Sequence, residues 1–232
     1  LHGCWMRNTE WLFYDVPGGR GTPLDRQRNW RLYDESSAGL LTELGSHHFQ
    51  VANWVLGAQP EWVMGSGSLN FYTDGREVDD NISLIFRYPG GVHFTYECLN
   101  SNAHNGMNFQ VLGHKATYEL EANKTYLETP PEPPALRRLI HSIETDLFET
   151  IPIGGATWIP DQPVEYGGDY ISEDYQLNDT QLSLEAFAGF VRRGQAPSEL
   201  TTQGYLSSVW TLLAEQAIKT RQAVTLPPEY RL

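Results

Sequence analysis

Hydrophobic positions along the chain change their spacing from one segment to the next. Trp11 to Asp34 mixes glycine, proline, arginine and aromatic residues without a period, and this pattern favours a long ordered loop. Beyond it, leucine and valine recur at helical spacing until Gly57. The chain is therefore predicted to form one helix from Ser37 to about Leu56.

Apolar and polar residues then alternate, as they do in half-buried strands. The clearest case is a hairpin, in which Ile82 to Tyr88 and Val92 to Cys98 flank a Pro-Gly-Gly turn. Further strands are predicted at Trp62–Tyr72, Phe109–Leu112, Ala116–Glu121 and Lys124–Glu128. The connections are short, which antiparallel pairing permits, so we expect an antiparallel sheet of about five or six strands.

The last third of the chain returns to helical spacing. Helices are predicted at Ala135–Glu149, Asp179–Arg193 and Thr201–Arg221, followed by a short strand at Val224–Leu226. Residues 130–177 are expected to contain a partly irregular insertion. A helix, then strands, then helices indicates an α+β fold, an open and mainly antiparallel sheet with helices packed on one face. A length of 232 residues fits a single domain, residues 1–232.

Composition narrows the classes of function. The chain has 29 acidic and 16 basic residues and a formal net charge of −13, so a nucleic-acid partner is not expected. Its apolar runs are shorter than the roughly 20 residues that cross a bilayer, so we expect a soluble protein without a membrane partner, in the cytoplasm or the periplasm. Two cysteines without metal-ligand spacing do not predict a structural metal site.

The predicted first helix carries the most promising chemistry. Projected at about 100° per residue, Glu43, His47, Gln50 and Trp54 form a polar stripe separate from the apolar one. A carboxylate beside an imidazole suits proton transfer, and Gln50 could donate a hydrogen bond to a substrate. The alternative is an ordinary helical pair without chemistry. His48 projects to the apolar side and is predicted to be a packed core residue.

Two ligand sites are not supported by the sequence. A metal site at Glu43, His47 and His48 fails on geometry, because adjacent helical residues point about 100° apart. The glycine pattern Gly65-Ser-Gly67 imitates a dinucleotide motif but is predicted to lie within a strand and is not followed by a helix. We therefore expect no metal and no complete cofactor-binding motif.

The segment from Ala38 to Gly57 resembles a motif of the glucose-fructose oxidoreductase and inositol dehydrogenase (Gfo/Idh/MocA) family. In that motif, glycines and a leucine precede Asp-x-Gly-x-His, and a further Asp follows. Two segments that resemble those preceding the motif in one branch of the family stand before it here, at Trp5-Met-Arg-Asn8 and Asn29-Trp-Arg-Leu-Tyr33. The resemblance extends over nearly the whole chain.

The resemblance implies a Rossmann domain that binds NAD or NADP, followed by an open-sheet domain like the C-terminal domain of dihydrodipicolinate reductase. The second domain shapes the substrate pocket and often makes the oligomer contact. This chain resembles only that C-terminal substrate and oligomerisation domain. We therefore expect the N-terminal Rossmann domain, with the family's catalytic lysine, to be missing. The fragment alone is expected to be inactive and to bind neither NAD nor NADP, and the protein is expected to be a homo-oligomer through the sheet.

Site residues follow position by position from the resemblance. His47 matches the family's acid/base histidine, Glu43 stands where the family usually has Asp, and Gln50 replaces the later Asp. The resemblance also implies that Trp30, Arg31 and Tyr33 bind the substrate. It implies that Arg7 and Asn8 face the cofactor.

Three functions remain open at this stage. The first is an NAD(P)-dependent oxidoreductase acting on a hydroxyl of a sugar, polyol or related carbohydrate. The second is a relative that uses NAD in a redox-neutral glycoside cleavage. The third is a module for oligomerisation or ligand binding without chemistry, whose sheet face should then be apolar and covered by a partner.

Overall fold

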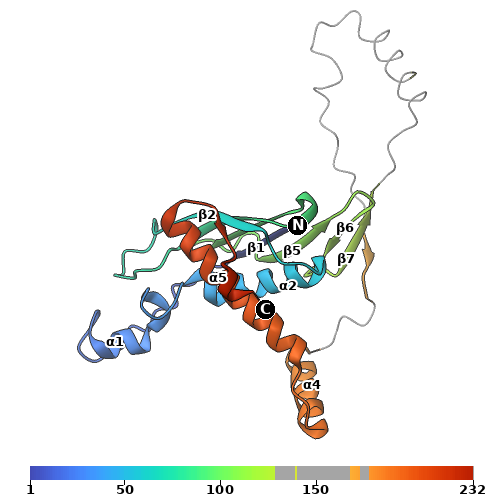
Figure 1. Cartoon of the computed structure of the whole chain (residues 1–232). Coiled ribbons are helices and arrows are strands. Elements are labelled where there is room, and N and C mark those ends of the chain that lie inside the picture. The colour runs from blue at the N-terminus through green and yellow to red at the C-terminus, as the bar shows by residue number, and fades with distance from the viewer. Residues whose placement is uncertain (129–138, 140–167, 173–177, 232) are drawn as a thin grey trace, which may run out of the picture.

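A computed structural model describes residues 1–128, 139, 168–172 and 178–231 of the chain. A single mixed sheet organises them (Figure 1). In chain order its described strands are β1 (His2–Met6), β2 (Trp62–Ser68), β3 (Asn81–Arg87), β4 (His93–Leu99), β5 (Met107–Leu112), β6 (Ala116–Glu119), β7 (Lys124–Leu127), β8 (Asp169–Tyr170) and β9 (Val224–Thr225). Across the sheet they follow the order β8-β7-β6-β5-β1-β4-β3-β2-β9.

Helical segments precede, interrupt and follow the strands. They are α1 (Pro23–Arg28), the 3₁₀ turn η1 (Trp30–Leu32), the π-helical turn η2 (Leu41–Gly45), α2 (Ser46–Leu56), the 3₁₀ turn η3 (Pro89–Gly91), α4 (Asp179–Arg193), α5 (Ser198–Thr220) and the 3₁₀ turn η5 (Pro228–Tyr230). Helices α2 and α5 pack against each other, and α5 packs on β2. The helices thus cover one face of the sheet, as the sequence predicted.

The core lies between α2, α5 and the central strands. Alternate residues of β3 and β4 point into it, and Phe86 lies opposite Phe94 while Leu84 lies opposite Tyr96. Trp210 of α5 is fully buried against this aromatic layer. The predicted hairpin is confirmed, and its turn contains Gly90 and Gly91 with positive φ.

The sheet is larger than predicted. Strand β1 lies between β4 and β5 and runs parallel to β4, whereas the other described pairings are antiparallel. Local alternation could not reveal this, because β1 reaches β4 across some ninety residues of chain. Strands β8 and β9 are two residues long and too short to give a periodic signal. The expectation of a mainly antiparallel sheet is confirmed.

The segment predicted to be a loop, Trp11 to Asp34, contains two helical pieces. Helix α1 begins after Thr22, whose hydroxyl accepts the amide hydrogen of Asp25 at 3.3 Å, and Pro23 occupies its first turn. A Thr followed by Pro is a common helix N-terminus, so the prediction of a continuous loop is wrong here although the sequence contains the signal for α1.

The first long helix also begins later and less regularly than predicted. Ser37 and Ala38 precede it, and Leu41 to Gly45 form a π-helical turn in which the amide of Ser46 donates to the carbonyl of Leu41. A projection at about 100° per residue therefore fails across this turn. As a result Phe49 and Ala52 are buried, whereas Val55, one of the valines at helical spacing, is exposed.

The C-terminal helices α4 and α5 confirm the prediction to within three residues. Figure 1 shows that α4 and the adjacent end of α5 project away from the sheet. The helix predicted at Ala135–Glu149 and nearly all of the insertion at 130–177 lie outside the described residues. Within the described segments, no helix combines the length and the apolar character needed to span a membrane.

Candidate active site

Two adjacent histidines of α2 occupy opposite environments. His48 is 3% exposed and packs against the rings of Trp5, Tyr96 and Phe109. Neither of its ring nitrogens has a hydrogen-bond partner among the described residues, and burial lowers its pKa to about 4. The predicted core histidine is confirmed, and it is held neutral at physiological pH.

His47, in contrast, is exposed. Its ring lies 5.8 Å from the ring of Trp5, which β1 places beside α2. The indole therefore borders the imidazole of an exposed residue. An exposed imidazole next to an aromatic surface can exchange a proton with a bound molecule.

Glu43 does not pair with His47 as the helical projection suggested. Its Oε2 accepts a hydrogen bond from Nε of Arg31 at 2.7 Å, and the described hydrogen bonds include none between Glu43 and His47. The π-helical turn carries Glu43 and changes its angular relation to the regular helix that carries His47. Sequence reasoning selected Glu43 and Arg31 separately, and the structure brings these two together.

Arg31 comes from η1, next to Trp30. Its guanidinium carbon lies 4.9 Å from the centre of the Trp30 ring, and both side chains are exposed. Trp30, Arg31 and Glu43 thus form one connected polar and aromatic group, and Glu43 precedes His47 by four residues along the chain.

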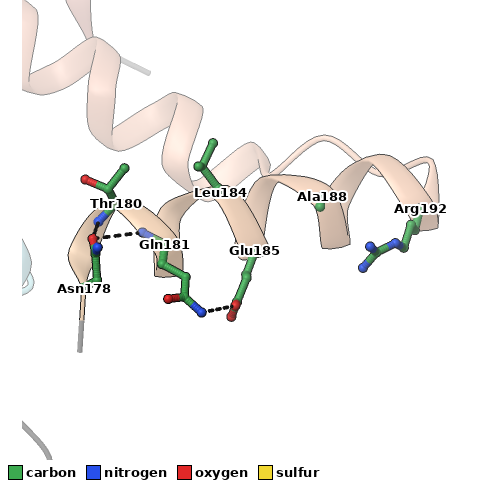
Figure 2. A pocket seen from close by; sticks show the side chains of 7 residues that line it. All are labelled: Asn178, Thr180, Gln181, Leu184, Glu185, Ala188 and Arg192. Atoms are coloured by element: carbon green, nitrogen blue, oxygen red, sulfur yellow. Dashed lines mark hydrogen bonds between the residues drawn. The ribbon is translucent and has the colours of Figure 1, made fainter. Parts of the chain in front are cut away.

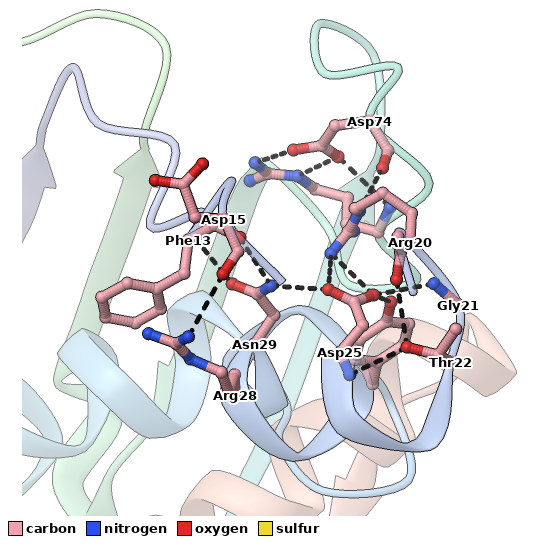
Figure 3. Close-up of polar contacts among 12 residues, drawn as sticks. Phe13, Asp15, Arg20, Gly21, Thr22, Asp25, Arg28, Asn29 and Asp74 are labelled. Carbon is pink, nitrogen blue, oxygen red and sulfur yellow. Dashed lines mark hydrogen bonds and ion pairs between the residues drawn. The ribbon is translucent and has the colours of Figure 1, made fainter. Parts of the chain in front are cut away.

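A buried carboxylate fixes the loop that carries this surface (Figure 3). Asp25 accepts hydrogen bonds from Nη1 of Arg20 at 2.7 and 2.9 Å, from the amide of Gly21 at 2.8 Å and from Nδ2 of Asn29 at 2.6 Å. The hydroxyl of Tyr33 donates to it as well. Burial alone would raise the pKa of Asp25, but the hydrogen bonds from Tyr33, Gly21, Asn29 and Arg20 together lower it to about 2.

Asn29 and Tyr33 stand immediately before and after η1, so one carboxylate holds both ends of that turn. Tyr33 is buried and its hydroxyl hydrogen is committed to Asp25, so this side chain supports the loop where the sequence suggested a substrate contact. Sequence reasoning missed Asp25. Its place in the first turn of α1 was visible, but its partners come from three separate positions in the loop.

The other predicted residues lie nearby or on the adjoining strand end. Gln50 is partly buried on α2. The guanidinium of Arg7 lies 6.0 Å from the centre of the Trp11 ring, and Asn8 is exposed and forms an isolated bridge with Ser101. Both lie just after Met6, where β1 ends.

The glycines that imitate a dinucleotide motif serve packing. A Cβ at Gly65 would lie 2.3 Å from Cδ2 of Leu84, and one at Gly67 would lie 2.1 Å from Oδ2 of Asp79. Both belong to β2, whose backbone pairs with β3. This glycine pattern is therefore part of a packed strand and not a phosphate-binding turn. Nor do they contain a group of three metal-ligating side chains.

A shallow pocket also lies along α4 (Figure 2). Its lining residues are Asn178, Thr180, Gln181, Leu184, Glu185, Ala188 and Arg192. Asn178 caps the helix by accepting the amides of Thr180 and Gln181, and Gln181 donates to Glu185. These polar groups satisfy one another, and the pocket contains none of the residues of the His47 region.

Part of the chain is similar in sequence to known proteins. Residues 11–119 match the GFO/IDH/MocA C-terminal domain. Over 84 residues, 35% of this chain, the sequence is 33% identical to trans-1,2-dihydrobenzene-1,2-diol dehydrogenase of Mus musculus, of which the match covers 23%.

Solved structures share the fold over 97% of this chain. One is levoglucosan dehydrogenase in complex with NADH and levoglucosan, with 12% identity, a TM-score of 0.61 and 58% of its own length covered. Another is the WlbA dehydrogenase from Bordetella pertussis in complex with NADH and UDP-GlcNAcA, with 12% identity, a TM-score of 0.52 and 53% covered. This chain thus spans a little over half the length of either structure. Its sequence is similar to the GFO/IDH/MocA C-terminal domain over residues 11–119, and its fold is that of these dehydrogenase structures.

Proposed function

We propose that this chain supplies the substrate-binding and proton-transferring part of an NAD(P)-dependent oxidoreductase that acts on a hydroxyl of a sugar, a polyol or a related carbohydrate. The observation that carries the proposal is the exposed imidazole of His47, which lies beside Trp5 and follows Glu43 of the Arg31–Glu43 pair by four residues in the chain. The similarity to levoglucosan dehydrogenase and to a mouse diol dehydrogenase supports hydroxyl compounds as substrates.

In the proposed reaction, a substrate hydroxyl lies against His47, which accepts its proton as the carbon is oxidised. Trp30 and Trp5 provide apolar surface for the ring of the substrate, and Gln50 provides a neutral hydrogen-bonding group. NAD or NADP would supply the hydride acceptor. We propose that it binds to a separate nucleotide-binding domain of the full-length protein, as the family resemblance implies, and that Arg7 and Asn8 face it.

We also propose that copies of the protein associate through the sheet face opposite the helices. Met64 and Ile85 lie side by side in register on that face and are exposed. Ser66, Ser83 and Glu97 interrupt the apolar surface in the next row. This face therefore combines apolar and polar residues, as interfaces between protein copies commonly do. It favours an oligomer contact in a catalytic protein over a module whose only role is to dock a partner on an apolar face.

The role of His47 can be tested by His47→Asn in the full-length protein. Asparagine keeps a hydrogen-bonding group but cannot accept a proton near neutral pH, so kcat should fall by about 100-fold or more while KM changes little. His104→Asn, in an exposed loop, is the matched control and should retain kcat. Near-normal turnover of His47→Asn would refute the acid/base role.

Measuring NADH against product distinguishes the redox function from its rival. One NADH formed per product molecule supports net oxidation. Product without accumulated NADH would favour the redox-neutral cleavage instead.

A further inference from the structure

Arg31 and Glu43 leave part of their hydrogen-bonding capacity unused. Arg31 donates through Nε, which leaves the N–H groups of its two terminal nitrogens. Across the described parts of the chain, neither these nitrogens nor Oε1 of Glu43 has a hydrogen-bond partner. The side chains are 45% and 18% exposed, respectively. The pair therefore presents free donors next to a free acceptor at the surface.

The charges of the pair decide which chemical groups it can accept. Arg31 is neutralised by Glu43 at 2.7 Å, so it offers an incoming anion little net attraction. A carboxylate or a phosphate bound to Arg31 would also approach the negative charge of Glu43. A hydroxyl group both donates and accepts hydrogen bonds, so two adjacent hydroxyls can match the arginine donors and the free Oε1 together.

The surface is held in place before any ligand arrives. Asp25 fixes both ends of η1, and the hydroxyl of Ser36 donates to the carbonyl of Trp30 at 2.7 Å. Stacking on Trp30 restricts the guanidinium further. Because these contacts have already ordered Arg31, a ligand loses less binding free energy to side-chain ordering. The exposed indole of Trp30 adds an apolar surface against which the C–H groups of a sugar can pack.

From this arrangement we propose that Arg31 and Glu43 bind two adjacent hydroxyls of an uncharged sugar or polyol and select against sugars that carry a carboxylate or a phosphate. The inference rests on the proposed function, since it names the substrate class of the same site. Arg31 anchors the diol, and Glu43 provides the discrimination.

Calorimetric titration of the full-length protein without NAD tests this directly. The uncharged probes are glucose, myo-inositol and levoglucosan, and the charged probes are glucuronate and glucose 6-phosphate. At least one uncharged probe should bind about tenfold more tightly than either charged probe. Arg31→Ala should weaken that binding by about tenfold or more, because it removes charged hydrogen-bond donors. Glu43→Gln should bring the two classes to within about threefold, because it removes the repelling charge.

Arg28→Ala is the matched control. This arginine lies in the same segment but donates to the carbonyl of Asp15 and stacks on Phe13, so its loss should change neither affinity nor selectivity. The inference is overturned if a charged probe binds as tightly as the best uncharged one, if no uncharged probe binds, or if Arg31→Ala leaves binding unchanged. The titration needs no turnover, so diol binding without NADH formation would refute the proposed function and leave this inference intact.

Discussion

Two arginine–carboxylate pairs in neighbouring regions have the same length and different consequences. Arg20–Asp25 and Arg31–Glu43 both measure 2.7 Å between nitrogen and oxygen. The Asp25 side chain is 0% exposed and receives hydrogen bonds from four residues, whereas the partly exposed Glu43 receives one. Because the hydrogen-bonding capacity of Asp25 is used within the protein, its role is structural. The unused capacity of Glu43 leaves it available to a ligand.

Asp25→Ala should give the largest loss of stability. It leaves the guanidinium of Arg20, the side-chain amide of Asn29 and the hydroxyl of Tyr33 without this acceptor, and at about 1–3 kcal/mol for each unsatisfied buried group the loss should reach about 3–5 kcal/mol. Urea unfolding followed by circular dichroism measures the change in the free energy of unfolding. A loss below about 1 kcal/mol would remove the distinction between the two carboxylates.

The next largest effect is a pH dependence of stability in the core beside the site. The pKa of His48 is lowered from 6.5 to about 4 in the folded chain, so the unfolded state binds protons more readily. Stability should therefore fall as the pH drops from about 6.5 to about 4, by up to about 3 kcal/mol.

Replacement of the titrating ring isolates this contribution. His48→Phe should flatten that part of the pH profile, whatever it does to stability at neutral pH. Asp25, with its pKa lowered from 3.8 to about 2, contributes stability that is lost only below this window. An unchanged slope between pH 6.5 and 4 in His48→Phe would contradict the assignment.

The smallest effect is expected at the exposed pair. Arg31→Ala, Glu43→Ala and the double variant form a cycle whose coupling energy should be about 1 kcal/mol or less, because solvent screens a partly exposed ion pair. Thermal unfolding of the four proteins provides the measurement. Coupling comparable to the loss in Asp25→Ala would mean that Glu43 also has a structural role.

The sequence was informative wherever a local pattern determines structure. Alternation placed the β3–β4 hairpin, and the helical projection separated His47 from the buried His48. It failed where contacts are distant in sequence. The parallel pairing of β1 depends on partners far along the chain, and Asp25 acts through a loop that has no period of its own.

The π-helical turn defeated the projection for another reason. It breaks the regular angle per residue on which the projection of Glu43 and His47 relied, and nothing in its composition distinguishes it from an α-helix.

That turn also makes the site sensitive to the length of the chain. A π-helical turn contains one residue more than the α-helical turn it replaces, so it is equivalent to a single inserted residue. Deleting one residue between Leu41 and Gly45 would restore a regular helix and rotate the preceding residues by about 100° around the helix axis. Glu43 and Arg31 would then separate while His47 kept its place. A gain or loss of one residue in this turn is thus a route by which relatives with the same fold could acquire different substrate selectivity.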